Sequence, residues 1–175
     1  SKDEWLNIHD AIDTLSNLPF YIDDTPNISV SEMQFKLQKL KEENECPLGV
    51  IFVDYLQLLE DIEKTDNRVQ ELSKITRSLK KLARELNVPI IVLSQLSRSV
   101  ETRTNKRPML SDLRESGSIE QDADVVIMLY RDEYYNNNTI EKNIIEIILA
   151  KQRNGPVGTA KLKFNPQFLY FENNI

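Results

Sequence analysis

Hydrophobic residues recur at helical spacing in three stretches of the chain. They occupy steps of three and four along residues 5–15, residues 30–40 and about residues 67–87. This spacing places apolar side chains on one face of a helix. Ser29 or Ser31 stands where the second helix would start, and Thr65 or Asp66 could cap the third. The sequence therefore predicts three amphipathic helices, of which the third is the longest.

Short apolar runs without helical period separate these helices. They cover residues 50–53, 90–93, 125–129 and 144–149. Uninterrupted runs of this length are typical of strands buried on both faces of a parallel sheet flanked by helices. Helices and strands follow each other in turn, which favours an α/β domain with right-handed crossovers.

The pattern changes after Leu149. Gly155 and Pro156 indicate a turn, and residues 159–164 and 168–171 are short strand-like segments. The sequence thus predicts a mostly parallel sheet with an antiparallel edge at its C-terminal end.

Composition narrows the class of protein. A length of 175 residues suits one compact domain, and a net charge of -6 excludes an overall basic nucleic-acid binder but not a local basic patch. One cysteine and one histidine exclude a disulfide scaffold and a thiolate or histidine zinc site, and they disfavour a Ser-His-Asp triad. The sequence shows neither a membrane span nor a signal peptide, which fits a reducing, cytosol-like compartment. The start at Ser1 rather than Met indicates a fragment or a processed product.

Polar residues follow the predicted strands directly. Asp54 ends the first apolar run, and Gln95 follows the second by two positions. Ligands of open parallel sheets gather at the carboxyl ends of the strands. An acid there can hold Mg²⁺ through water, and an amide there can donate to a phosphate oxygen or orient water. Each residue also fits the ordinary start of a polar loop, and for Asp54 taken by itself that interpretation is preferred.

Two cations follow the fourth apolar run. Lys151 and Arg153 alternate along the chain, so in an extended segment their side chains point the same way. The pair could clamp an anion or reach into a neighbouring subunit. A strand edge protected by charge is the alternative.

A basic segment precedes the third strand. Residues 98–114 carry five cations and two acids, a charge of +3 within an acidic chain: Arg98, Arg103, Lys106, Arg107 and Arg114 against Glu101 and Asp112. We expect a long mobile loop that contacts a phosphate backbone, and a plain flexible surface loop is the alternative. Small residues at 116–118 open a short helix whose N–H groups suit a phosphate. No aromatic residue interleaves with these cations, so base stacking is not indicated.

These pieces also occur together in a recognisable order. The relevant stretches are IFVDYLQL at 51–58, NVPIIVLSQLSR at 87–98, KRPMLSDLRESGSIEQDAD at 106–124, YRDEYY at 130–135 and AKQRNGPVG at 150–158. With them the chain resembles the C-terminal motor domain of the DnaB-family replicative DNA helicases, which has a RecA-like fold. The resemblance runs from about Leu18 to the C-terminus, and the stretch at 106–124 is its most specific part.

The resemblance implies a role for each of these residues. Asp54 would be the Walker-B acid acting on Mg²⁺, and Gln95 would sense the γ-phosphate of ATP. Arg153, with Lys151 beside it, would be an arginine finger inserted into the next subunit's nucleotide site. The remaining assignments concern DNA: Arg114, Glu115 and Gly117 would lie in the DNA-facing loop, which adds to the contacts expected of Arg103, Lys106 and Arg107.

The resemblance also implies an assembly and a setting. Such helicases are homohexameric rings that load on single-stranded DNA and unwind duplex DNA 5′ to 3′ at the replication fork. A primase and a helicase loader would be partners, no membrane would be involved, and the compartment would be the bacterial cytoplasm or the plastid stroma.

One departure from the family pattern is large. The sequence contains no G-x-x-x-x-G-K-[ST] phosphate loop, and none of its four glycines can form one. We therefore interpret residues 1–175 as one partial ATPase domain, the C-terminal part of a helicase, which hydrolyses no ATP in isolation. A non-catalytic module that binds single-stranded DNA or docks on a helicase ring is the alternative. A RecA-like recombinase or circadian-clock-type ATPase would share the sheet but not residues 112–121.

Overall fold

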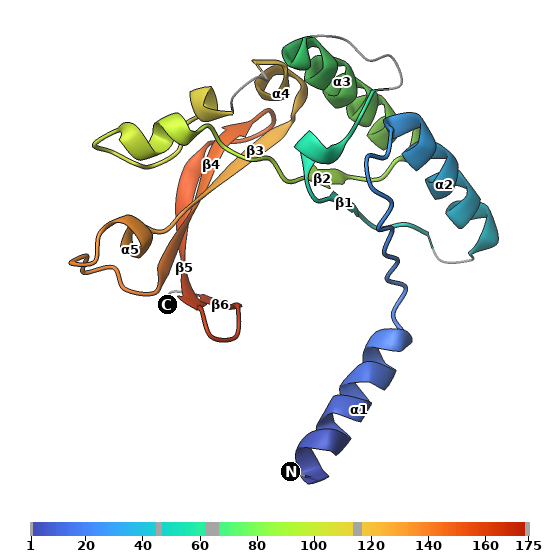
Figure 1. The fold of residues 1–175 in the computed structure, drawn as a ribbon, viewed down its shortest axis with the longest axis horizontal. Coiled ribbons are helices and arrows are strands. Elements are labelled where there is room, and N and C mark those ends of the chain that lie inside the picture. Colours follow the sequence, from blue (N-terminus) through green and yellow to red (C-terminus); the bar gives the residue numbers. More distant parts are fainter. Residues whose placement is uncertain (1, 45–46, 62–66, 114–116, 174–175) are drawn as a thin grey trace.

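The computed structural model describes residues 2–44, 47–61, 67–113 and 117–173 (Figure 1). Within these ranges, no helix is long and apolar enough to cross a membrane. The elements in chain order are α1 (Lys2–Ser16), α2 (Val30–Glu43), β1 (Ile51–Val53), η1 (Leu56–Leu58), α3 (Arg68–Leu86), β2 (Ile90–Val92), η2 (Arg98–Thr102), η3 (Leu110–Asp112), α4 (Gly117–Asp122), β3 (Val125–Tyr130), α5 (Asp132–Tyr135), β4 (Ile144–Gln152), β5 (Gly158–Asn165) and β6 (Tyr170–Asn173).

The three predicted helices are confirmed as α1, α2 and α3. α2 starts after Ser29, whose hydroxyl accepts a hydrogen bond from the N–H of Glu32 at 3.2 Å. The cap of α3 is Asn67, whose side chain accepts from the N–H groups of Val69 and Gln70. Thr65 and Asp66, which we expected to cap this helix, lie outside the described residues.

The strands form two sheets rather than one. β1 pairs with β2 in parallel, and β3, β4, β5 and β6 form an antiparallel sheet in that order. The predicted α/β class and its antiparallel C-terminal edge are confirmed, but β3 and β4, which we expected in the parallel part, belong to that edge. The segment between them, residues 131–143, holds the four-residue helix α5, and the chain turns back there instead of crossing over.

Two apolar clusters hold the fold. The larger one packs α3 against α2 and the parallel strands, and its most buried members are Leu56, Leu72, Ile75 and Leu82. The smaller one joins Val126 and Met128 of β3 to Leu113, with Ile119 of α4 packed against it. Because Ile119 touches both clusters, α4 lies where the two parts of the molecule meet.

β3 is covered on one face only. Along β3, Val126, Met128 and Tyr130 are buried, whereas Val125, Ile127 and Leu129 are exposed. Phe52 of β1 is 64% exposed. Ile91 of β2 is exposed as well. The prediction of strands buried on both faces is therefore wrong for β1, β2 and β3, because an apolar run reports what a strand could bury and not what this chain supplies to cover it.

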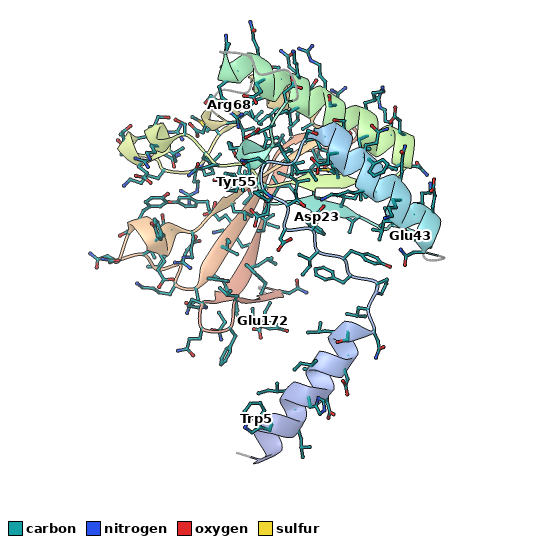
Figure 2. All side chains as sticks on the ribbon, turned by 45° about the vertical axis from the view of Figure 1, so that its right-hand side comes forward. Trp5, Asp23, Glu43, Tyr55, Arg68 and Glu172 are labelled. Atoms are coloured by element: carbon teal, nitrogen blue, oxygen red, sulfur yellow. The ribbon has the colours of Figure 1, made fainter. Side chains whose placement is uncertain are left out.

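α1 stands apart from both sheets. Figure 1 and Figure 2 both show it separated from the rest of the molecule by an extended segment. Trp5 on this helix is 73% exposed, and its apolar neighbours at helical spacing are exposed as well. The periodicity thus predicted the helix correctly, although the face that it creates covers nothing here.

Candidate nucleotide and DNA site

Asp54 and Gln95 lie at one edge of the parallel sheet. Val53 and Val92 are the last paired residues of β1 and β2, so the two strands end at the same carboxyl edge of the sheet. Beyond that pair, the N–H of Leu93 donates to the carbonyl of Val53 at 2.9 Å. Asp54 and Gln95 are both exposed to solvent. The expected acid and amide therefore emerge from neighbouring strands.

Gln57 ties the two strand-end segments together. Its side-chain amide donates to the hydroxyl of Ser94 at 3.1 Å, and its side-chain oxygen accepts from the N–H of Gln95 at 3.3 Å. Its own carbonyl accepts from the guanidinium of Arg68 at 2.7 Å. Sequence reasoning missed Gln57, although a polar side chain between two leucines three positions after Asp54 was a usable signal.

The carboxylate at this edge suits a hydrated Mg²⁺. Asp54 supplies one exposed carboxylate. Within the described ranges, no group of three or more His, Cys, Asp or Glu residues could hold a metal ion. Mg²⁺ keeps several waters and is commonly held by one or two carboxylates together with substrate phosphates. The residues therefore fit a magnesium ion shared with a nucleotide, and they do not fit an all-protein cage.

Lys151 and Arg153 both contact the C-terminal end of α4. The ammonium group of Lys151 donates to the carbonyls of Glu120, Gln121 and Ala123, the last at 2.7 Å. The guanidinium of Arg153 donates to the carbonyl of Gln121 at 2.6 Å. Carbonyls at a helix C-terminus lack helical partners and attract cations. The expectation that the two side chains point the same way is confirmed.

Asp124 completes the surroundings of Arg153. Its carboxylate lies 3.4 Å from Nε of Arg153 and also contacts the ammonium group of Lys80. The hydrogen bond from Lys80, and then the positive charges of Lys80, Arg153 and Arg84, hold the pKa of Asp124 below its usual value, against the opposing effect of burial. The contacts of Arg153 thus run to its own α4 and Asp124 rather than to Asp54 or Gln95.

The basic segment is folded around a buried acid. Asp112 accepts from the guanidinium of Arg103 at 2.6 Å and from the N–H of Met109 at 2.7 Å. Its side chain is 5% exposed. We expected a long mobile loop here, but two short 3₁₀ helices, η2 and η3, organise this segment. Net charge could not show that one of the two acids serves as an internal anchor.

Arg107 pairs with a buried acid on β4. Its Nε and Nη2 donate to the two oxygens of Glu146 at 2.9 and 2.6 Å. The side chain of Glu146 is 8% exposed, and the guanidinium lies over the ring of Tyr130 at 4.7 Å. The ammonium group of Lys106 lies 5.0 Å from the ring centre of Tyr135. Aromatic rings therefore accompany these cations in space although none interleaves with them in the sequence, because the rings come from a distant segment.

The predicted DNA contacts have different positions in the structure. Arg103 and Arg107 pair their guanidinium groups with carboxylates of their own chain, and their contact with DNA stays a prediction. Arg114 and Glu115 lie outside the described residues. Gly117 is the first residue of α4.

An aromatic cavity of about 300 Å³ opens beside this cation cluster. Tyr134, Tyr135, Phe164 and Phe171 contribute to its wall, and Arg131 and Lys106 add positive charge. The guanidinium of Arg131 lies 5.4 Å from the ring centre of Phe164. Sequence reasoning did not predict this cavity, since its lining comes from separate stretches of the chain.

We expect one tyrosine of this cluster to titrate late. Burial, and then the hydrogen bond that its hydroxyl donates to Asp132 at 2.6 Å, raise the pKa of Tyr130 to about 12. Because the pKa of Tyr130 is raised in the folded state, the neutral side chain stabilises the folded protein fully below pH ~10. This contribution is lost as pH rises through the folded-state pKa. Alkaline titration followed by ultraviolet absorbance should show a late transition that Tyr130→Phe removes. Tyr170→Phe is the control, and persistence of the late transition in Tyr130→Phe would contradict the assignment.

Comparison with known proteins gives a consistent result. The family model described as "DnaB-like helicase C terminal domain" matches residues 1–173. A probable replicative DNA helicase of Trieres chinensis is 58% identical over 179 residues, covering 100% of this chain and 39% of that protein. The replicative DNA helicase DnaB of Geobacillus stearothermophilus is 58% identical over 174 residues, covering 99% and 38%. The chain thus spans about two fifths of the length of these relatives.

Two solved structures share the fold. One, described as an ATPase domain, superposes with a TM-score of 0.93 at 48% identity, covering 98% of this chain and 60% of that one. The other, described as a DnaB-like replicative helicase and its interactions with primase, gives a TM-score of 0.94 at 47% identity, covering 100% and 42%.

Proposed function

Because the chain belongs to the DnaB-like helicase C-terminal domain family, we propose that it is the C-terminal part of an ATP-dependent replicative DNA helicase. One observation carries the proposal. Asp54 and Gln95 leave neighbouring parallel strands at the same edge, and Gln57 joins their segments. An acid and an amide at the carboxyl edge of parallel strands are placed to serve a bound nucleotide.

Each residue of this edge has a role in phosphoryl transfer. Asp54 holds the water shell of Mg²⁺, and the side chain of Gln95 contacts the γ-phosphate of ATP. When bound, the metal ion neutralises charge on the phosphate oxygens. The sequence lacks the phosphate-binding loop, so this chain supplies the acid and the sensor, and the remainder of the helicase supplies the loop.

Arg153 and Lys151 act on the nucleotide of a neighbouring subunit. The side chain of Arg153 is half exposed, and it lies at α4 rather than beside Asp54. A finger that acts between subunits requires a head-to-tail interface, which closes into a ring. A homohexamer is the assembly that we propose.

The aromatic cavity suits the base of a nucleotide. Its volume of about 300 Å³ and its tyrosine and phenylalanine rings fit a planar ring, and its cations complement an attached phosphate.

The remaining assignments concern DNA and partners. Arg114, Glu115 and Gly117 contact the backbone of single-stranded DNA, with Arg103, Lys106 and Arg107 adding positive charge nearby. Unwinding proceeds 5′ to 3′ at the replication fork, with a primase and a loader as partners. The related helicase structure that is described with its primase interactions supports the first of these partners. The bacterial cytoplasm or the plastid stroma is the expected compartment.

Strand separation by the full-length protein tests the proposal. With ATP and Mg²⁺, it should separate a forked duplex that carries a free 5′ tail and leave a duplex with only a 3′ tail intact. Asp54→Asn should abolish separation while DNA binding persists, and the isolated 175-residue chain should hydrolyse no ATP. Full unwinding by the Asp54→Asn protein would contradict the role of the acid, and absence of unwinding on both substrates would contradict the helicase assignment.

A further inference from the structure

Lys151 and Arg153 are both held at the C-terminal end of α4 in their own subunit, and Arg153 also contacts the carboxylate of Asp124. We propose that Asp124 is a positioning residue for Arg153, which fixes the guanidinium in the orientation from which it reaches the neighbouring nucleotide. The inference rests on the proposed function, because it assigns a second residue to the action of Arg153.

Asp124 contacts Arg153 through both its backbone and its side chain. The N–H of Arg153 donates to the carbonyl of Asp124 at 3.0 Å, and Nε lies 3.4 Å from the carboxylate. Nη2 donates to the carbonyl of Gln121. Arg153 follows the last residue of β4, and its backbone bond to Asp124 continues the pairing of β3 with β4. The side-chain contacts with Asp124 and Gln121 then set the direction of the guanidinium.

The charge around Asp124 strengthens this role. Lys80 and Arg84 of α3 face its carboxylate together with Arg153, and Lys151 occupies the adjacent carbonyls of α4. Without the carboxylate, the guanidinium would lose the counter-charge that stands between it and these cations. Like charges at this spacing repel one another, and they would displace the exposed end of Arg153.

Asp124 also lies on a fixed support. Thr76 of α3 donates to the carboxylate of Asp122 at 2.7 Å, and the hydroxyls of Ser73 and Ser118 lie 2.9 Å apart. These bonds fasten both ends of the short helix α4 to α3. The position of Arg153 is therefore tied to α3, the longest helix among the described residues.

Steady-state ATP hydrolysis by the full-length ring, in the presence of single-stranded DNA, tests the proposal. Asp124→Asn should lower kcat about three- to tenfold with an unchanged KM, since a partly exposed charged hydrogen bond is lost that orients a group acting on the transition state. Asp124→Glu keeps the charge and should retain most of kcat. Glu172→Gln, which removes an exposed carboxylate from β6, away from α4 and its contacts, is the matched control and should leave kcat unchanged.

The double variant shows whether Asp124 acts through Arg153. In an Arg153→Ala background, Asp124→Asn should cause no further loss of kcat. Independent, multiplying losses would overturn the positioning role, and so would a normal kcat for Asp124→Asn beside a reduced kcat for Arg153→Ala. A normal kcat for Arg153→Ala would instead show that the finger assignment itself is wrong, and the inference would fall with it. Unfolding temperatures of these proteins separate such outcomes from a general loss of folding.

Discussion

Arg153→Ala is expected to lower the kcat of ATP hydrolysis by the full-length ring about a thousandfold, the scale at which an arginine finger acts in phosphoryl transfer. The guanidinium neutralises charge that develops on the transferring phosphoryl group, and alanine leaves that charge without a partner. Nucleotide binding should persist, because the acid and the sensor that meet the ground-state nucleotide belong to the other subunit. Steady-state hydrolysis and binding of a fluorescent ATP analogue measure the two quantities separately.

Mixed rings test whether the finger acts between subunits. Rings of Arg153→Ala protein and rings of Asp54→Asn protein should each be inactive. A ring that contains both should recover part of the activity, because some interfaces then pair an intact acid with an intact finger. A finger acting within its own subunit would give no recovery. Lys163→Ala, which removes an exposed cation from neighbouring β5, is the control for the charge change.

The second large effect concerns stability. Arg107→Leu should lower the free energy of unfolding by about 2–3 kcal/mol, less than for a fully buried pair because the side chain of Arg107 is partly exposed to solvent. The cause is Glu146, whose carboxylate would remain buried without its bidentate partner. The guanidinium would also leave the face of Tyr130. Urea unfolding of the chain, followed by circular dichroism, measures the loss.

Two further variants separate this role from a DNA contact. Lys106→Leu removes a neighbouring cation that contacts a ring, and it should cost about 0.5 kcal/mol. Glu146→Leu added to Arg107→Leu should restore part of the lost stability, since no buried charge then remains at this position. If Arg107→Leu instead left stability unchanged and reduced the salt dependence of DNA binding by about one charge, the DNA contact would be its main role.

Local sequence patterns predicted the helices and strands well, because the spacing of apolar residues within a segment decides which of the two it can form. The spacing of Leu72, Ile75, Leu79 and Leu82 requires a helix, and each short apolar run between turns is a strand in the structure. Strand direction was not predictable in this way. The run that forms β4 would look the same with a parallel or an antiparallel neighbour, and only the chain between the strands decides.

The residues of the candidate site also differ in how far the local sequence could predict them. Asp54 and Gln95 were found because each closely follows a strand, so a parallel sheet brings them to one edge. Arg107 and its partner Glu146 are 39 positions apart and meet only through the fold. The charge pattern of the sequence therefore predicted a surface role for Arg107, whereas in the structure its guanidinium pairs with a buried carboxylate.

The uncovered row of β3 has a consequence for anyone who prepares this chain by itself. The exposed side chains of β3 form an apolar stripe made of Val125, Ile127 and Leu129, and Phe52 of β1 is exposed as well. Such stripes adsorb hydrophobic dyes and drive colloidal association at high concentration. Dilute samples, mild detergent or a covering polypeptide would therefore keep the preparation dispersed.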